Sequence, residues 1–285
     1  MDDVNIRLVA TDLDGTLLNS ARAVSPRSAA AMAAAAEAGI IVVWATARAK
    51  HSVHALATTC GFHGIAVAAN GAVVIDLADG TPNIVDVQPL TADVARAATE
   101  RVGQLVPGTV FATVGPTRFI ADPGYAALCV FTDHHRDPGT MERSDAASLD
   151  DEPIVKIVAR HPDIASEILF RRVQAAGMPE VTPTHSGAPY LEMAALGVSK
   201  ASALARLCAR WDIDRSEVAA CGDAINDLPM LNWAGQALCP ANASVDALAV
   251  ADHVLPSNDD DGVATYLESL ITAITAVERP AGHTR

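Results

Sequence analysis

The chain lacks the features that mark nucleic-acid-binding, membrane-spanning and disulfide-stabilised proteins. No basic run occurs along its 285 residues, whose formal net charge is -14, and binding to a phosphate backbone needs clustered Lys and Arg. No apolar run reaches membrane-spanning length, and acids stand where a signal peptide would carry bases. The five cysteines are scattered and form no C-x-x-C pair, so they indicate neither a zinc site nor a disulfide framework. We therefore expect a cytoplasmic protein without nucleic-acid or membrane partners.

The composition and the order of local patterns predict a folded α/β protein. Half of the residues are apolar and 19% are charged, as in water-soluble globular proteins. An apolar run over residues 6–11 is too short for a helix and indicates a buried parallel strand. A helix between Pro26 and Gly39 follows, then a second buried strand (40–45) and a second helix (50–60). This alternation favours a doubly wound parallel sheet.

A different pattern interrupts this alternation. Residues 65–88 have the pattern of consecutive antiparallel strands, and residues 87–187 have that of an α+β module with its own core. Helix–strand alternation then returns until about residue 276. At roughly 150 residues per domain, the chain is long enough for two domains. We expect a discontinuous core domain (1–86 and 188–276), an inserted α/β domain (87–187) and a disordered tail (277–285).

The strongest functional signal is the D-L-D-G-T sequence at residues 12–16, directly after the first strand. Residues two apart in an extended chain point the same way, so Asp12 and Asp14 are expected to face one site. Doubly wound sheets bind ligands at the carboxyl ends of their strands, and Gly15 lets the chain turn away there. Two carboxylates this close repel each other unless a cation lies between them, and a hard divalent ion suits oxygen ligands. A solvated acidic turn is the alternative, but the apolar strand before the motif favours a metal site.

A second acidic segment, G-D-A-I-N-D at residues 222–227, also lies between an apolar strand and a helix. Asp223 stands at the end of the strand, where it can offer a third carboxylate to the same metal ion. Asn226 and Asp227 fall in the first helical turn, where acids also favour the helix dipole. Helix capping is therefore an alternative role for Asp227, and the metal interpretation gains its weight from the first motif.

Two further residues are candidates for holding a phosphate group. Thr46 follows the second strand, where a hydroxyl and backbone N–H groups can bind phosphate oxygens. Lys200 opens a helix and can act as a point charge on phosphate. Neither is specific alone, because Thr is common in strands and most lysines are solvated surface residues.

In this order and in these strand contexts, the four segments resemble the haloacid dehalogenase (HAD) superfamily, and within it the Cof-type phosphatases, over residues 5–275. Weaker similarities are A-N-G-A at 69–72, L-E-M at 191–193, G-V-S-K at 197–200 and the Asp-rich turn at 258–263. The resemblance implies a Rossmann-like core with a C2-type α/β cap. The cap is inserted between the segment at Thr46 and the segment that contains Lys200, where residues 87–187 lie.

The resemblance also implies a role for each matching residue. Asp12 is the nucleophile on phosphorus, and Asp14 protonates the leaving oxygen and then deprotonates the hydrolytic water. Mg²⁺ is held by Asp12, the backbone carbonyl of Asp14, and Asp223. The phosphate-binding residues are Thr46, Lys200 and Asn226, and Lys200 also restrains Asp12. The supporting residues are Gly15, Arg48, Asn70 and Asp227.

The sequence departs from the Cof-type pattern at Ala47 and Ala201, where the family usually has Gly. Neither change removes a reacting group, and Ala47 adds a methyl group beside the approach of the substrate or of Arg48. Four residues of the inserted domain are candidates for substrate contact: Arg118, Tyr125, Arg136 and His185.

We therefore expect an Mg²⁺-dependent phosphohydrolase of small organic phosphate monoesters, such as sugar phosphates or a phosphorylated cofactor. It would act through an aspartyl-phosphate intermediate, which divides the reaction into two easier displacements. Two alternatives use the same residues: a phosphotransferase or phosphomutase, and a non-catalytic phosphate-ligand-binding or regulatory protein. The sequence leaves the substrate, the pathway and the oligomeric state open.

Overall fold

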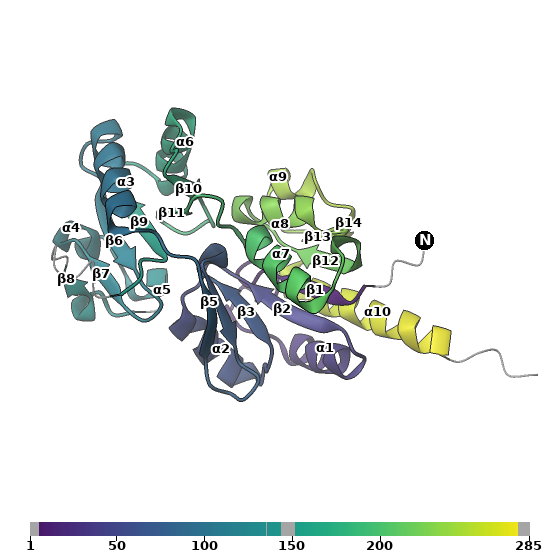
Figure 1. Ribbon diagram of the computed structural model, residues 1–285. Coiled ribbons are helices and arrows are strands. Elements are labelled where there is room, and N and C mark those ends of the chain that lie inside the picture. Colours follow the sequence, from purple (N-terminus) through teal and green to yellow (C-terminus); the bar gives the residue numbers. More distant parts are fainter. Residues whose placement is uncertain (1–5, 135, 144–151, 279–285) are drawn as a thin grey trace, which may run out of the picture.

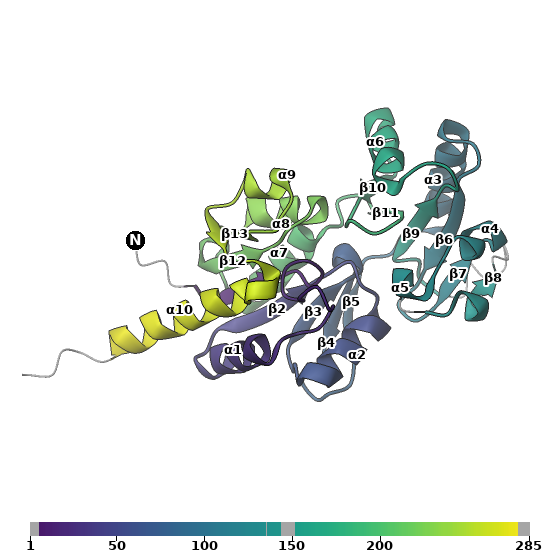
Figure 2. The same cartoon turned by 180° about the vertical axis from the view of Figure 1, so that it is seen from behind.

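The computed structural model describes residues 6–134, 136–143 and 152–278. It contains an eight-stranded and a six-stranded β-sheet, each with its own helices. Figure 1 shows the sheets in two lobes, with the six-stranded sheet and helices α3 and α6 at the upper left, and Figure 2 shows the same lobes from behind. The α/β fold expected from the sequence is confirmed. Among the described helices, none combines the length and the apolar character needed to cross a membrane.

The core lobe consists of the eight-stranded sheet, in the order β14-β13-β12-β1-β2-β3-β4-β5, and its helices. The strands from β14 to β3 run parallel, and β4 and β5 continue the sheet in antiparallel fashion. The strands are β1 (Leu8–Thr11), β2 (Ile41–Ala45), β3 (Ile65–Ala68), β4 (Val73–Asp76), β5 (Asn83–Val87), β12 (Val218–Cys221), β13 (Gln236–Pro240) and β14 (His253–Leu255). The helices are α1 (Pro26–Glu37), α2 (Lys50–Cys60), α7 (Lys200–Trp211), α8 (Leu228–Trp233), α9 (Val245–Leu248) and α10 (Gly262–Glu278).

Helices cover both faces of the eight-stranded sheet, because successive residues of a strand point to opposite faces. On β1, Val9 packs with residues of α1, α2 and α10, whereas Leu8 and Ala10 pack with residues of α7, α8 and α9. All three side chains are fully buried. A strand that is buried on both faces has a continuous apolar sequence, which is why residues 6–11 predicted it correctly.

The cap lobe consists of the six-stranded sheet, in the order β10-β11-β9-β6-β7-β8, and its helices. Its pairs are antiparallel except β7 with β8. The strands are β6 (Val110–Val114), β7 (Phe119–Ala121), β8 (Glu142–Arg143), β9 (Lys156–Arg160), β10 (Val181–Thr184) and β11 (Leu191–Ala195). The helices are α3 (Ala92–Leu105), α4 (Pro123–Ala127), α5 (Phe131–His134) and α6 (Ser166–Ala176).

The two faces of the cap sheet meet different partners. Ile157 and Met193 pack with residues of α3 and α6 in a cluster confined almost wholly to this lobe. On the other face, Val114, Phe119 and Val158 belong to the same buried cluster as residues of the core lobe. The lobes therefore share apolar packing as well as polar contacts.

The division into two domains remains a proposal, but the sheets bear on its boundaries. Strand β11 lies in the cap sheet although it follows residue 187, where we placed the end of the inserted domain. Helix α10 extends to Glu278 and includes the first two residues of the expected tail, while residues 279–285 lie outside the described part of the chain.

Candidate active site

Three neighbouring parallel strands bring predicted site residues to one edge of the core sheet. Strand β1 lies between β12 and β2. Asp12 follows β1, Thr46 follows β2, and Asp223 comes two residues after the end of β12. Because carboxyl ends of parallel strands meet at the same edge, these side chains converge although they are far apart in sequence.

Lys200 lies at the centre of this edge. A reciprocal capping box between Ser199 and Ser202 begins helix α7 and fixes Lys200 as its first residue. The Lys200 Nζ donates to Asp12 Oδ1 at 2.5 Å and to Asp227 Oδ1 at 2.6 Å, and the Lys200 side chain is fully buried. Burial alone would lower the pKa of Lys200, but the charges of Asp12 and Asp227 outweigh it and raise that pKa above its ordinary value. Lys200 is therefore a permanent cation.

Three carboxylates surround this one cation. Oxygens of Asp12, Asp223 and Asp227 lie within 4.8 Å of one another. Burial, reinforced by the neighbouring carboxylates and opposed by Lys200, raises the pKa of Asp12 well above its usual range. Burial and the charge of Asp227 raise the pKa of Asp223 to about 6. These shifts show an excess of negative charge, and a hard divalent cation with oxygen ligands would offset it.

The three acids are not equivalent as metal ligands. Asp227 Oδ1 accepts from Lys200, and Asp227 Oδ2 accepts from the backbone N–H groups of Asp223 and Ala224, both at 3.0 Å. Both of its oxygens are thus already used to hold the site together. Asp227 is therefore the least available of the three to a metal ion, and the metal-binding roles of Asp12 and Asp223 stay a prediction.

Gly15 allows the close approach of the first motif to Asp223. Its φ of +83° lies in the left-handed region, and a Cβ atom there would lie 2.5 Å from Asp223 Oδ2. Thr16, the next residue, donates from Oγ1 to Asp223 Oδ1 at 2.8 Å. The turn that reverses the chain after Asp14 therefore also orients Asp223.

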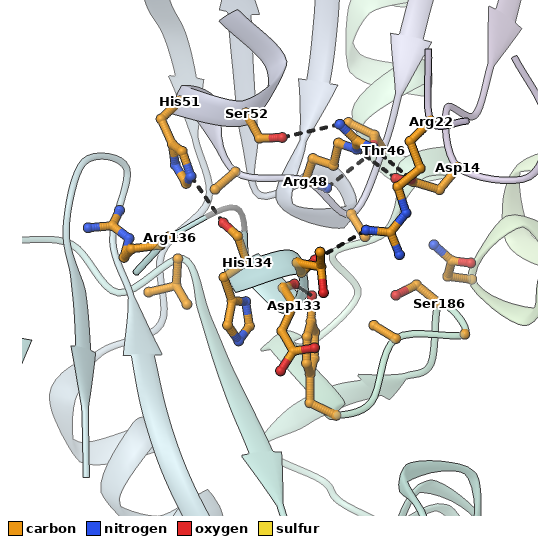
Figure 3. Close-up of a pocket in the computed structure, with 18 of the residues that line it drawn as sticks. Asp14, Arg22, Thr46, Arg48, His51, Ser52, Asp133, His134, Arg136 and Ser186 are labelled. Atoms are coloured by element: carbon orange, nitrogen blue, oxygen red, sulfur yellow. Dashed lines mark hydrogen bonds and ion pairs between the residues drawn. The ribbon is translucent and has the colours of Figure 1, made fainter. Parts of the chain in front are cut away.

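Asp14 faces the same site but is held by a different cation. The Arg48 guanidinium donates to both of its carboxylate oxygens, with Nη2–Oδ1 at 2.6 Å and Nε–Oδ2 at 2.7 Å. The backbone N–H of Arg48 donates to Thr46 Oγ1, and this bond stabilises the turn that follows β2. The Asp14 side chain is 48% exposed, whereas that of Asp12 is 8% exposed. Separate cations and different solvent access thus distinguish two carboxylates that are two residues apart. Figure 3 shows the pairing of Arg48 with Asp14.

Asn70 and Asn226 form a buried amide pair beside the edge. Asn226 Nδ2 donates to Asn70 Oδ1 at 3.0 Å, while Asn70 Nδ2 and Asn226 Oδ1 find no hydrogen-bond partner among the described residues. Gly71, at φ +101°, lets this turn touch the start of α7, because a Cβ atom there would lie 2.0 Å from the Ser199 carbonyl oxygen. Asn226 also lines the cavity described next, so a ligand there can meet an amide with hydrogen-bonding capacity left.

A cavity of about 420 Å³ lies between the two lobes, above this edge. The core lobe lines it with Asp12, Asp14, Thr46, Arg48 and others, and the cap lobe lines it with segments 114–119, 132–134 and 186–190 and with Arg136 and Lys156. Of the four cap candidates, Arg118 and Arg136 line the cavity. Tyr125 instead contacts Phe119 and His134, and His185 contacts Ser166 and Phe170.

Lys156 is a cavity residue that the sequence analysis missed. Its Nζ donates to Glu192 Oε1 at 2.6 Å and to the backbone carbonyl of Ala47 at 2.9 Å. Glu192 Oε2 in turn accepts from Ser186 Oγ at 2.7 Å. A buried lysine of the cap therefore holds the segment of the core that follows β2. The available signal was a lysine inside the otherwise apolar run of residues 154–159.

Two further contacts, also missed, join the lobes across the cavity. Arg22 Nη1 donates to the Thr132 carbonyl oxygen at 3.3 Å, and His51 Nε2 lies 3.2 Å from the carbonyl oxygen of His134 (Figure 3). Both are contacts to backbone atoms, so they depend on how the lobes are placed and not on particular cap side chains.

The sequence of the chain is similar to those of known proteins over most of its length. The family model of haloacid dehalogenase-like hydrolases matches residues 9–267. A 5-amino-6-(5-phospho-D-ribitylamino)uracil phosphatase of Bacillus subtilis is 27% identical, covering 92% of this chain and 95% of its own. A phosphoglycolate phosphatase of Methanopyrus kandleri is 29% identical, covering 94% of this chain and 99% of its own.

Solved structures agree on the fold. A protein of Streptococcus mutans UA159 superposes with a TM-score of 0.81 at 22% identity, over 94% of this chain and 99% of its own. A HAD-superfamily phosphatase of Bacteroides thetaiotaomicron gives a TM-score of 0.79 at 22% identity, over 94% and 96% of the two chains. Family match, full-length phosphatase relatives and fold all agree with the expectation from the sequence, and the chain belongs to the haloacid dehalogenase-like hydrolases.

Proposed function

We propose that the chain is an Mg²⁺-dependent phosphatase of small phosphate monoesters, with Asp12 as the nucleophile. The observation that carries the proposal is the position of Asp12: it lines the cavity between the lobes, is bound to the buried Lys200, and lies beside Asp223 and Asp227. The bond from Lys200 orients the carboxylate of Asp12 and opposes the rise in its pKa that burial causes, and a nucleophile needs both effects.

In the first step, an oxygen of Asp12 forms a bond to phosphorus while the bond from phosphorus to the ester oxygen breaks. The leaving oxygen takes a proton from the carboxyl group of Asp14, which lines the same cavity and has the greater access to solvent. Arg48 bonds both oxygens of the ionised carboxylate and so orients Asp14. One of these oxygens must release Arg48 to carry the proton when Asp14 acts as the acid. The products of this step are the alcohol and an aspartyl phosphate on Asp12.

In the second step, a water molecule attacks phosphorus and Asp14, now ionised, accepts its proton. The bond between phosphorus and the Asp12 oxygen breaks, which restores the carboxylate of Asp12 and releases inorganic phosphate. Asp14 ends the cycle protonated, so protons and charges balance. Lys200 stabilises negative charge on Asp12 as it leaves.

The donor set at this edge fits a divalent metal ion. Asp12, Asp223 and the backbone carbonyl of Asp14 would hold Mg²⁺, which when bound offsets the repulsion between the anionic nucleophile and the anionic ester. Thr46 and Lys200 would donate to phosphoryl oxygens, as would the second hydrogen of Asn226 Nδ2, whose first is donated to Asn70. Asp227, Gly15 and Asn70 support these groups through the contacts described above.

The cavity and the relatives support a small substrate. A volume of about 420 Å³ is within the usual range for small-molecule sites, and residues of both lobes line it. Relatives include a phosphoglycolate phosphatase and an HMP-PP phosphatase of Yersinia enterocolitica, 27% identical over 94% of this chain. The absence of a nucleic-acid partner and a cytoplasmic location stay part of the proposal, and the five free cysteines are compatible with a reducing compartment.

The test is phosphate release from a panel of sugar phosphates, nucleotides and short-chain acid phosphates, with Mg²⁺ or EDTA. We expect Mg²⁺-dependent turnover that falls by at least about 10³-fold in Asp12→Asn. Asp246→Asn, an exposed acid in the first turn of α9, is the matched control and should keep wild-type activity.

Two outcomes would contradict the proposal. Full activity of Asp12→Asn, with unchanged thermal unfolding, would exclude the aspartyl-phosphate mechanism. Transfer of labelled phosphate to an added sugar, with little free phosphate, would instead show a phosphotransferase that uses the same residues.

A further inference from the structure

The cavity has a charge of opposite sign to the protein as a whole. The chain carries a formal net charge of -14. The cationic side chains that line the cavity are Arg22, Arg48, Arg118, Arg136 and Lys156. The carboxylates that line it are Asp12, Asp14 and Asp133. Such a concentration of cations in an acidic protein indicates an anionic ligand.

Most of these charges are already balanced by a partner in the protein. At the nucleophile end, Lys200 pairs with Asp12 and Arg48 pairs with Asp14. On the cap side, the pairs are Arg118 with Glu142, Lys156 with Glu192, and Asp133 with Arg160. Among the residues that the structure describes, Arg22 and Arg136 are the lining cations without a carboxylate partner. The net charge that a ligand would meet is therefore carried by these two residues.

Arg22 is held at the cavity by the backbone of its own loop. Its φ of +59° is left-handed, a conformation that side chains other than Gly, Asn and Asp seldom adopt. Hydrogen bonds from Arg22 N to Asn19 O, at 2.8 Å, and from Asn19 N to Ala23 O, at 3.1 Å, close the turn. Asn258 Nδ2 anchors the loop by donating to the Leu18 carbonyl oxygen at 2.8 Å. An arginine is thus kept in a strained position in a loop that is otherwise well fixed.

The Arg22 guanidinium is available to a ligand on the leaving-group side of the site. In Figure 3 its side chain extends past Asp14 toward Asp133 and Ser186. One nitrogen makes a long hydrogen bond of 3.3 Å to a backbone carbonyl, and the residue is exposed. Arg136 differs, because in Figure 3 it lies at the opposite end of the cavity, beyond His51 and His134. Its Nε is buried without a partner among the described residues, and its guanidinium lies over the Phe119 ring.

We propose that Arg22 selects substrates whose leaving group carries a second acidic group, a carboxylate or another phosphate. The inference rests on the proposed function and names the class of ester that the same site takes. With the reacting phosphate at Asp12, the ester oxygen faces Asp14, and the remainder of a short substrate extends toward Arg22. A planar guanidinium binds carboxylate and phosphate oxygens in pairs, whereas a hydroxyl group at the same place gains far less.

The test compares esters that differ in one group. For the carboxylate arm, the pair is 2-phosphoglycolate and 2-hydroxyethyl phosphate. For the phosphate arm, the pair is 1,3-propanediol bisphosphate and 3-hydroxypropyl phosphate. We expect wild-type kcat/KM to favour the acidic member of at least one pair by about tenfold or more, and the arm with the larger ratio identifies the acidic group.

Variants assign this preference to a residue. Arg22→Gln should remove most of the preference, mainly by raising KM for the acidic ester, and should change kcat/KM for the neutral ester less than about twofold. Arg22→Lys should restore part of it. Arg27→Gln is the matched control, because Arg27 pairs with Glu268 away from the cavity and its loss should leave the preference intact. Arg136→Gln tests whether the other cation contributes.

Failure of this inference is distinguishable from failure of the proposed function. Equal turnover of acidic and neutral esters would overturn the inference and leave the phosphatase standing, as would an equal loss on both esters in Arg22→Gln. If no ester is hydrolysed, the phosphatase proposal fails, and calorimetric titration of the same pairs into Asp12→Asn decides the inference by itself. Tighter binding of the acidic member that Arg22→Gln abolishes would support it, and equal binding would overturn it.

Discussion

On the core side of the cavity, Lys200 joins charged groups into one network, whereas on the cap side the lining charges form separate ion pairs, apart from Arg136, which has no carboxylate partner among the described residues. Lys200 bridges Asp12 and Asp227, all at most 8% exposed, and Asp227 in turn receives two backbone N–H groups beside Asp223. In the cap, Arg118 pairs with Glu142 and Asp133 with Arg160, with no charge shared between these two pairs. The core side depends on every member of a network, while the cap side can change one pair at a time.

The strongest way to break the core network is Lys200→Met. It leaves two buried carboxylates without their cation, so we expect the free energy of unfolding in EDTA to fall by about 3–5 kcal/mol and phosphatase turnover to vanish. Urea denaturation at pH 7 measures the first effect. Lys50→Met, at the start of α2, is the control and should stay within about 0.5 kcal/mol of wild type. Equal stability of the two variants would show that Lys200 is not the centre of a network.

The corresponding change in the cap is Lys156→Met. It removes the cation from one carboxylate instead of two, and the Ser186 hydroxyl still donates to Glu192, so we expect a loss of about 2–3 kcal/mol. Because Lys156 also holds the Ala47 carbonyl, KM should rise more than kcat falls. The double variant Lys156→Met with Glu192→Leu should recover part of the stability, since no buried charge is left unpaired. A double variant less stable than Lys156→Met would contradict this account.

The same comparison explains what the sequence could predict. Asp12, Thr46 and Asp223 follow apolar strands, and parallel strands bring their carboxyl ends together whatever the loops do. Their convergence therefore followed from local patterns. The buried strands and the helices between them were predicted in the same way, because apolar runs and caps such as Ser25 at α1 are local signals.

The cap side of the cavity could not be predicted in this way. Arg118 and Arg136 line it but Tyr125 does not, and nothing in their local sequence distinguishes them. Their positions depend on how an antiparallel sheet is placed over another lobe. Lys156 and Arg22 were missed for the same reason, since their contacts with Ala47 and Thr132 join segments more than 100 residues apart.

Acid should weaken the cap through His134. Burial, with help from Lys156, Arg160, Arg136 and His51, lowers its pKa to about 3. The unfolded chain, with a pKa of about 6.5, then binds a proton that the native state does not, so stability falls as the pH drops from about 6.5 toward 3.

For one such histidine, the free energy of unfolding should fall by on the order of 2 kcal/mol between pH 7 and pH 5. His134→Gln keeps a polar partner for the Tyr125 hydroxyl and removes the titration, so its loss over this interval should be smaller by that amount. Denaturation at both pH values measures it. An equal pH dependence in wild type and variant would show that His134 titrates normally in the folded protein.

The smallest effect is expected where the two sides meet, at Ala47. The residue gives its backbone carbonyl to Lys156, and a glycine offers the same atom, so the link between the lobes should persist in Ala47→Gly. Added backbone freedom in the unfolded chain should cost about 0.5–1 kcal/mol of stability. The methyl group lines the cavity, so its loss should change kcat/KM less than about threefold for short esters and should help only bulkier ones. A tenfold or larger change on short esters would show that the methyl group at Ala47, and not the cap, selects the substrate.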